Sequence, residues 1–292
     1  MTAEEYALPS ETSTSVIGHL QITQARADET LLDVARRFDL GHDQIIAANP
    51  GINRWLPDTQ KNILIPSLYI LPLPHTSGIV INLAEFRLYF FPRDNQRVLT
   101  FPISIGDYDW RTPLGTTRII RKVKMPTWYP PESIRREHEE AGEFLPPVID
   151  NADPRNPLGQ FALYLGFSKY LIHGTDVTRA SGIGLRVSHG CIRMYPEDIE
   201  VLFHAVDVGT KVSIIHEPVK VGLKAGKIYL EYHRPQKDPF DTPLPEPEKT
   251  FSMFLSDVIS RVGESVRIDQ HSVLQVYQSG NGIPTAISST HY

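Results

Sequence analysis

Short runs of alternating apolar and polar residues constrain the fold of this 292-residue chain more than any other feature. From residue 79 to 123 these runs are rich in β-branched and aromatic side chains, and turn-forming residues separate them. The pattern predicts an α+β chain that is mostly β, with one sheet completed near residue 232. Its expected strands lie at 79–83, 87–91, 99–106, 116–123, 161–165, 170–173, 210–216 and 227–232.

Residues 124–160 interrupt the strands with repeated prolines around a charged segment at 132–141, which predicts a short helix. A long insertion in a compact β unit is usually either functional or disordered. Trp128 and Tyr129 argue against simple disorder, so we expect an ordered insertion. Another helix is predicted to begin at Pro196, because proline suits the first turn of a helix.

Residues 18–70 predict a smaller unit with the order β-α-α-β. Alternation predicts a strand at 20–23, and Thr30 is a good N-cap for the helix that follows. Asp43 is expected to cap the second helix, and 62–66 is expected to form the closing strand.

This order resembles a LysM module, a family that binds N-acetylglucosamine-containing glycans. Asp28-Glu29 stands where that family usually has Gly-Asp, and the usual glycine before the last strand is missing. A module kept only for packing is therefore the alternative. The residues that carry the resemblance are Glu29-Thr30-Leu31, Asn49-Pro50 and Leu64-Ile65-Pro66.

The remaining segments carry no recognisable chemistry. Residues 1–17 predict an extended arm, while 71–75 and 234–248 are Pro-rich and predict linkers. Residues 249–292 predict a small helical subdomain, because apolar residues from 251 to 262 recur at helical spacing. A second helix is expected around 273–277.

The composition excludes two function classes. A formal net charge of −5 gives no basic face for nucleic-acid binding. No run of 18 apolar residues exists, so we expect no transmembrane helix. The first residues have neither the basic nor the apolar stretch of a secretory signal. Either the protein is cytoplasmic, or a signal peptide is missing from this sequence.

Cys191 is the single cysteine, and its neighbours suggest a reactive thiol. A lone cysteine is more often a small buried apolar residue. Here it stands in Ser188-His189-Gly190-Cys191-Ile192-Arg193, downstream of Ile172-His173-Gly174-Thr175. A thiol attacks as the thiolate and needs a nearby base or cation, which His173, His189 and Arg193 can supply. The N–H groups of Gly190 and Cys191 could stabilise an oxyanion.

A zinc site made by His173, His189 and Cys191 is the alternative chemistry. No fourth ligand stands nearby in the sequence, so we favour a nucleophilic thiol and expect neither a metal nor a cofactor.

Taken together, these motifs closely resemble the signature of the L,D-transpeptidase family with its YkuD-type catalytic domain. The resemblance spans 77–233 and implies a β-sandwich-like catalytic domain, with a lid over its groove at about 124–160. Trp128 and Tyr129 are our candidates for walls of that groove. The supporting matches are Ile79-Val80-Ile81-Asn82, Pro102-Ile103-Ser104-Ile105-Gly106, Thr112-Pro113-Leu114-Gly115, Asn156-Pro157-Leu158-Gly159 and Gly182-Ile183-Gly184-Leu185-Arg186.

The resemblance implies a mechanism and its residues. Cys191 would attack the diaminopimelate carbonyl of a peptidoglycan stem tetrapeptide, and the terminal D-Ala would leave with His173 as proton shuttle. An acceptor amine would then resolve the thioester. The Gly174 carbonyl would orient His173. The residues implied to line the substrate site are Ser188, His189 and Arg193.

The acceptor stays open at this point. It can be a second stem peptide, a lysine of an outer-membrane lipoprotein or protein, or water in a hydrolase. A non-enzymatic protein that binds the wall through its LysM-like module is a further alternative. The resemblance to periplasmic enzymes of Gram-negative bacteria favours the periplasm, with a signal peptide absent from this sequence.

Overall fold

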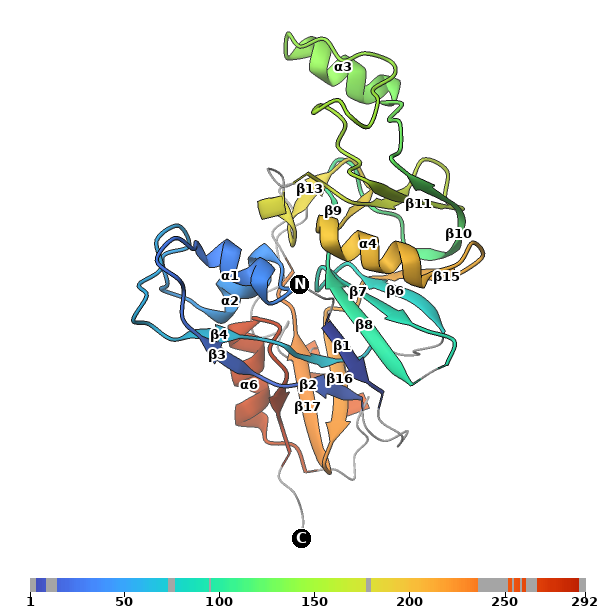
Figure 1. The fold of residues 1–292 in the computed structure, drawn as a ribbon. Helices are drawn as coiled ribbons and strands as arrows, with labels where there is room; N and C mark the ends of the chain where they lie inside the picture. The colour runs from blue at the N-terminus through green and yellow to red at the C-terminus, as the bar shows by residue number, and fades with distance from the viewer. Residues whose placement is uncertain are drawn as a thin grey trace.

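The computed structural model describes residues 4–8, 15–72, 77–94, 96–176, 180–235, 252–253, 255–257, 259–260 and 267–288. Over these residues the chain is mostly β with several short helices, which confirms the expected fold class (Figure 1). No helix within them is long and apolar enough to cross a membrane. The predicted linkers fall largely outside the described residues, whereas the described part of the first C-terminal helix, residues 252–253, 255–257 and 259–260, is helical as expected.

Nine strands form the largest sheet among the described residues, in the order β1-β8-β7-β6-β15-β10-β11-β12-β14. The pairs β6–β15 and β12–β14 are parallel, and the other pairs are antiparallel. Most expected strands are therefore present. Their bounds are β1 Glu4–Ala7, β6 Gly78–Asn82, β7 Arg87–Phe91, β8 Arg97–Pro102, β10 Gly115–Lys124, β11 Phe161–Leu165, β12 Leu171–His173, β14 Ile192–Arg193 and β15 Lys211–Ile215.

Helix α4 (Pro196–Ala205) covers one face of the sheet beside β11 (Figure 1). It begins at the predicted proline, and its buried Ile199 and Leu202 join the same apolar core as Ile172 and Ile192. Each such aliphatic side chain contributes about 1.5–3 kcal/mol when fully buried. This packing fixes β12 and β14, the strands that bear the histidine and cysteine motifs.

The expectation that 227–232 completes this sheet is wrong. β17 (Lys227–Tyr232) instead pairs with β16 (Val219–Lys224) and β18 (Thr285–Ala286) in a separate three-stranded sheet. Helix α6 (Gln270–Ser279) packs on β17 and shares its core. The helix expected around 273–277 is confirmed as α6, and the sheet on which it packs was not predicted, because alternation predicts a strand but not its partner.

The N-terminal unit has the predicted order β-α-α-β. Thr30 forms a capping box with Asp33 at the start of α1, as its position suggested. The expected cap at Asp43 is wrong, since α2 begins two residues earlier than that cap implies, with Gly41 at its N-cap. The unit contains β3 Gln21–Thr23, α1 Leu31–Arg37, α2 His42–Ala48 and β4 Ile63–Ile65, flanked by the pair β2 Val16–Gly18 and β5 Leu68–Ile70.

Polar contacts dock this unit onto the main sheet close to the cysteine motif. Arg36 binds Glu197 of α4 through two hydrogen bonds of 2.7 and 2.8 Å. The Tyr195 hydroxyl donates to the Leu40 carbonyl at 3.1 Å. Bidentate guanidinium–carboxylate pairs fix geometry as well as adding energy. The α1–α2 corner is therefore held directly behind the chain that leaves β14.

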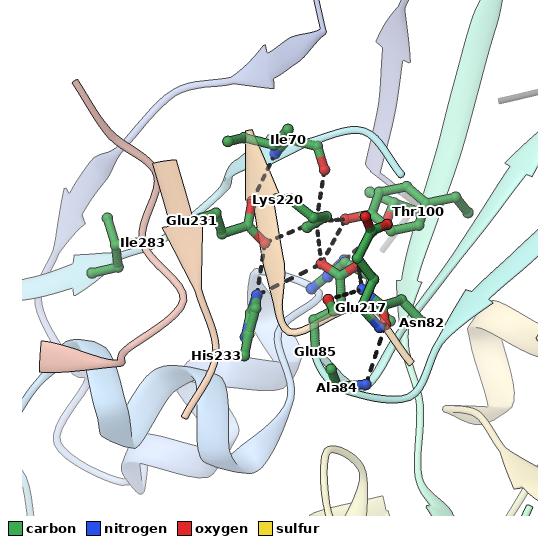
Figure 2. A network of polar contacts seen from close by, with 12 residues as sticks. Ile70, Asn82, Ala84, Glu85, Thr100, Glu217, Lys220, Glu231, His233 and Ile283 are labelled. Carbon is green, nitrogen blue, oxygen red and sulfur yellow. Dashed lines mark hydrogen bonds and ion pairs between the residues drawn. The ribbon is translucent and has the colours of Figure 1, made fainter. Parts of the chain in front are cut away.

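A buried ionic cluster joins the C-terminal sheet to the main sheet (Figure 2). The Lys220 ammonium lies 2.7 Å from Glu85 and 2.8 Å from Glu231, and it donates to the Ile70 carbonyl at 2.6 Å. His233 contacts Glu231 at 2.7 Å. Burial opposes ionisation of Glu231, yet Lys220 and His233 hold its pKa at about 2. Although Glu85, Glu231 and His233 have metal-ligand spacing, Lys220 already supplies a cation to both carboxylates.

Removing this buried cation should destabilise the fold. We expect Lys220→Met to lower the free energy of unfolding by about 3 kcal/mol, because two buried carboxylates would lose their partner. Urea denaturation followed by circular dichroism measures this loss. The exposed Lys227→Met, on the neighbouring strand, is the control and should change it by less than about 0.5 kcal/mol. Equal effects of both changes would refute a structural role for the cluster.

Candidate active site

A cavity of about 800 Å³ opens on the face of the sheet opposite α4. Its walls include Trp128 and Tyr129 of the insertion, as hypothesised from the sequence. Helix α3 (Glu132–Glu140), which stands apart from the sheet in Figure 1, contributes further wall residues. From the two motifs, the residues that line the cavity are His173, Ser188, His189, Cys191 and Arg193.

Strand pairing brings the two motifs together. β12 and β14 are parallel, with Ile172 opposite Ile192 and His173 opposite Arg193. Both isoleucines are fully buried in the core under α4. Because side chains alternate along a strand, His173, Cys191 and Arg193 point to the cavity face.

His173 is buried and neutral. Its ring Nδ1 donates to the Gly174 carbonyl at 2.7 Å, as the resemblance implied, and the side chain is almost fully buried. Burial and the nearby Arg193 charge lower its pKa to about 3, although carbonyl groups of Gly174 and Leu158 act in the opposite direction. Above that pH, the uncharged imidazole is available to accept a proton.

The surroundings of the Cys191 thiol favour its protonated form. Burial raises its pKa above the ordinary value, while the Leu171 backbone and Arg193 lower it only in part. The sulfur lies 3.8 Å from the Lys169 carbonyl. Arg193 therefore acts in the direction expected from the sequence, but it does not produce a resting thiolate. A base must remove the proton when the thiol attacks.

The turn before Cys191 is set by Ser188. Its hydroxyl donates to the Cys191 carbonyl and accepts the Gly190 N–H at 3.1 Å. That N–H is therefore occupied, which contradicts its expected oxyanion role in this conformation. Gly190 has φ +98°, and a Cβ there would lie 2.8 Å from the Tyr170 ring. Only glycine fits this turn.

Thr112 supports the same turn, and sequence reasoning did not single it out as a site residue. Its buried hydroxyl accepts the Gly106 N–H at 2.9 Å and donates to the Gly190 carbonyl at 2.9 Å. One side chain thus ties the cysteine turn to the end of β9 (Ile105–Gly106). Its place in a Thr-Pro-Leu-Gly motif was the available signal.

We expect Thr112→Val to reduce the rate of reaction at Cys191 by about tenfold and the free energy of unfolding by about 1–3 kcal/mol. The physical reason is that two buried backbone groups lose their partner. Rate assays and thermal unfolding of the purified variant test this. Thr112→Ser keeps the hydroxyl and should retain most activity. A Ser variant as impaired as the Val variant would assign the effect to the lost methyl group instead.

His189 connects the cysteine motif to helix α3. Its Nε2 lies 2.8 Å from a Glu137 carboxylate oxygen on α3, and its ring centre lies 5.3 Å from that of Trp110, with the two rings tilted by 58°. The ligand atoms of His173, His189 and Cys191 do not converge as the zinc alternative requires. Among the described residues, that spacing occurs only in the Glu85 cluster.

Comparisons of the sequence with a family model and with curated proteins point to the same family. Residues 76–214 match the family model described as the L,D-transpeptidase catalytic domain. The match ends before β17, which agrees with the separate C-terminal sheet. The chain is 42% identical over 237 residues to "Probable L,D-transpeptidase YbiS" of Escherichia coli strain K12, covering 80% of this chain and 76% of that protein.

A second curated protein and a solved structure that resemble this chain are also described as L,D-transpeptidases. "Probable L,D-transpeptidase ErfK/SrfK" of Salmonella typhimurium is 36% identical, over 98% of this chain and 92% of that protein. The solution structure of an Enterococcus faecium L,D-transpeptidase catalytic domain is 20% identical with a TM-score of 0.38, and it covers 49% of this chain and all of that one. The identity and coverage of the first two relatives show that this chain belongs to the L,D-transpeptidase family.

Proposed function

We propose that this protein is a peptidoglycan L,D-transpeptidase that works through a thioester on Cys191. The observation that carries the proposal is that a neutral, buried His173 on β12 and Cys191, directly before the adjacent parallel strand β14, both line one large cavity. A neutral imidazole that is oriented by a carbonyl is suited to take a thiol proton. Chemistry of this kind needs no metal or cofactor.

The proposed reaction has two acyl transfers. The Cys191 proton passes to Nε2 of His173 as sulfur bonds to the diaminopimelate carbonyl carbon. The bond from that carbon to the D-Ala nitrogen then breaks, and His173 returns the proton to the leaving amine. An acceptor amine next attacks the thioester, His173 takes the proton of that amine, and the thiol re-forms.

Surrounding groups would stabilise the intermediates. Arg193 places a positive charge close to both reacting side chains and favours the developing thiolate. Because the Gly190 N–H is held by Ser188, we assign oxyanion donation to the Cys191 N–H alone. Ser188 sets the turn, and His189 binds substrate on the lid side.

The location and the division of labour are also proposals. We infer periplasmic action on the cell wall, with residues 18–70 as a glycan-binding module and 77–215, without the separate C-terminal sheet, as the catalytic region. The acceptor is a stem-peptide amine, giving a 3-3 cross-link, or a lysine of an outer-membrane lipoprotein or protein. Family membership supports peptidoglycan as the substrate class.

One product analysis tests the proposal. The protein is incubated with tetrapeptide muropeptides, with and without a lysine-bearing acceptor peptide, and the products are identified by mass. Cross-linked dimers support stem-peptide acceptors, and a peptide adduct supports anchoring. Release of peptide from a pre-anchored substrate without either product would indicate a hydrolase. No change in any substrate would refute the enzymatic proposal and favour a wall-binding protein.

A further inference from the structure

Arg121 lies in the same cross-strand row as Cys191, on the cavity face of the sheet. β10 pairs Arg121 with Tyr164 of β11, and Tyr164 pairs with Leu171 of β12. When the β12–β14 register is extended by one residue, Leu171 lies opposite Cys191, which precedes β14. All of these side chains line the cavity. An irregularity between Ile119 and Arg121 sets this register, so the sequence alone does not place the arginine there.

The guanidinium of Arg121 is fixed in place by an aromatic ring, but no described carboxylate neutralises its charge. It lies 3.9 Å above the centre of the Tyr164 ring, and among the described residues it forms no ion pair. Arg155, another cation at this cavity, is instead paired with Asp153 at 2.6 Å. Stacking on an aromatic ring fixes the plane of a guanidinium and leaves its N–H donors free at the edge. Arg121 therefore presents to the cavity an oriented guanidinium whose N–H donors have no carboxylate partner among the described residues.

The distance between Arg121 and Cys191 suits a donor group that is remote from the attacked carbonyl. Three strand intervals separate the backbones of Arg121 and Cys191, which is about 14 Å at the usual strand spacing. The side chain leans over Tyr164, toward Cys191, and shortens that gap. A donor attacked at Cys191 can thus reach Arg121 only with a group several bonds away from its reacting carbon.

We propose that Arg121, stacked on Tyr164, determines donor specificity by binding a free carboxylate remote from the attacked carbonyl. This inference rests on the proposed function, which supplies a donor with two such groups. They are the carboxylate at the far end of the diaminopimelate side chain and the α-carboxylate of the preceding glutamate. A bidentate guanidinium–carboxylate contact would discriminate an acid from its amide.

Binding to a Cys191→Ser protein tests the inference without turnover. Isothermal titration measures the Kd of a tetrapeptide donor, of its side-chain amide and of its glutamate amide. Arg121→Gln in that background should weaken binding of the acid about 10- to 100-fold, as expected for one charged hydrogen-bonded contact. The donor whose Arg121-bound carboxylate is replaced by an amide should bind weakly to the Cys191→Ser protein already, and Arg121→Gln should not weaken its binding further. The amide that behaves in this way identifies the carboxylate that Arg121 binds.

Arg118→Gln is the matched control, because Arg118 is exposed on the same strand and does not line the cavity. It should leave all three Kd values unchanged. Equal Kd values for the acid with Arg121→Gln and Arg118→Gln would overturn the inference, as would equal weakening of the acid and both amides. If Arg121→Gln weakens donor binding but the unmodified protein transfers no acyl group, the proposed function would be refuted and the binding role of Arg121 would stand.

Discussion

Replacing Cys191 with alanine is expected to abolish acyl transfer, lowering kcat/KM by about 10⁴-fold or more. The reason is that the thioester cannot form, and no second cysteine exists to substitute for it. The sulfur makes only weak contacts with backbone groups, such as the Lys169 carbonyl at 3.8 Å, so the loss of its thiol should leave folding intact. The measurement is the rate of product formation from tetrapeptide muropeptides, together with a thermal melting curve.

Val187→Ala is the control for disturbance of the same loop, because Val187 is exposed on β13 (Arg186–Ser188). It should retain activity within about twofold. A carbapenem should add its mass to the unmodified protein and to this control but not to Cys191→Ala. Transfer activity that survives in Cys191→Ala would show that another group captures the acyl chain, and the thioester mechanism would be wrong.

His173→Gln is expected to reduce kcat/KM by about 10²- to 10⁴-fold, the usual contribution of a positioned base. The pH profile should also differ from that of an ordinary histidine enzyme. With a pKa of about 3, His173 stays neutral across the physiological range, so kcat/KM of the native protein should show no acid limb between pH 8 and 5. A limb near pH 6.5 would contradict the buried, neutral base.

The same histidine couples stability to pH. Its pKa is lowered on folding from the ordinary 6.5 to about 3, so between these values the unfolded chain binds the proton and the native protein does not. The free energy of unfolding should therefore fall as pH is lowered through this window. His173→Gln should flatten that slope, whereas the exposed His204→Gln should leave it unchanged. Equal slopes for all three proteins would exclude this linkage.

Local patterns were sufficient for much of the fold. Thr30 caps α1 and Pro196 begins α4 because capping and proline geometry are properties of a few adjacent residues. The motifs around His173 and Cys191 likewise identified the candidate chemistry before any contact was known. Asp43 shows the limit, since a residue in the first turn and an N-cap have similar local signals.

What the sequence determined by itself was the set of elements and the chemical identity of the candidate site residues, because both are encoded over short distances. Only the tertiary structure decided which strands pair and in which register. In that structure β17 belongs to a second sheet, the Gly190 N–H donates to the Ser188 hydroxyl, and Arg121 lies in the same cross-strand row as Cys191. Strand register depends on packing between segments far apart in the chain, and a shift of one residue reverses every side chain. No local pattern carries that information.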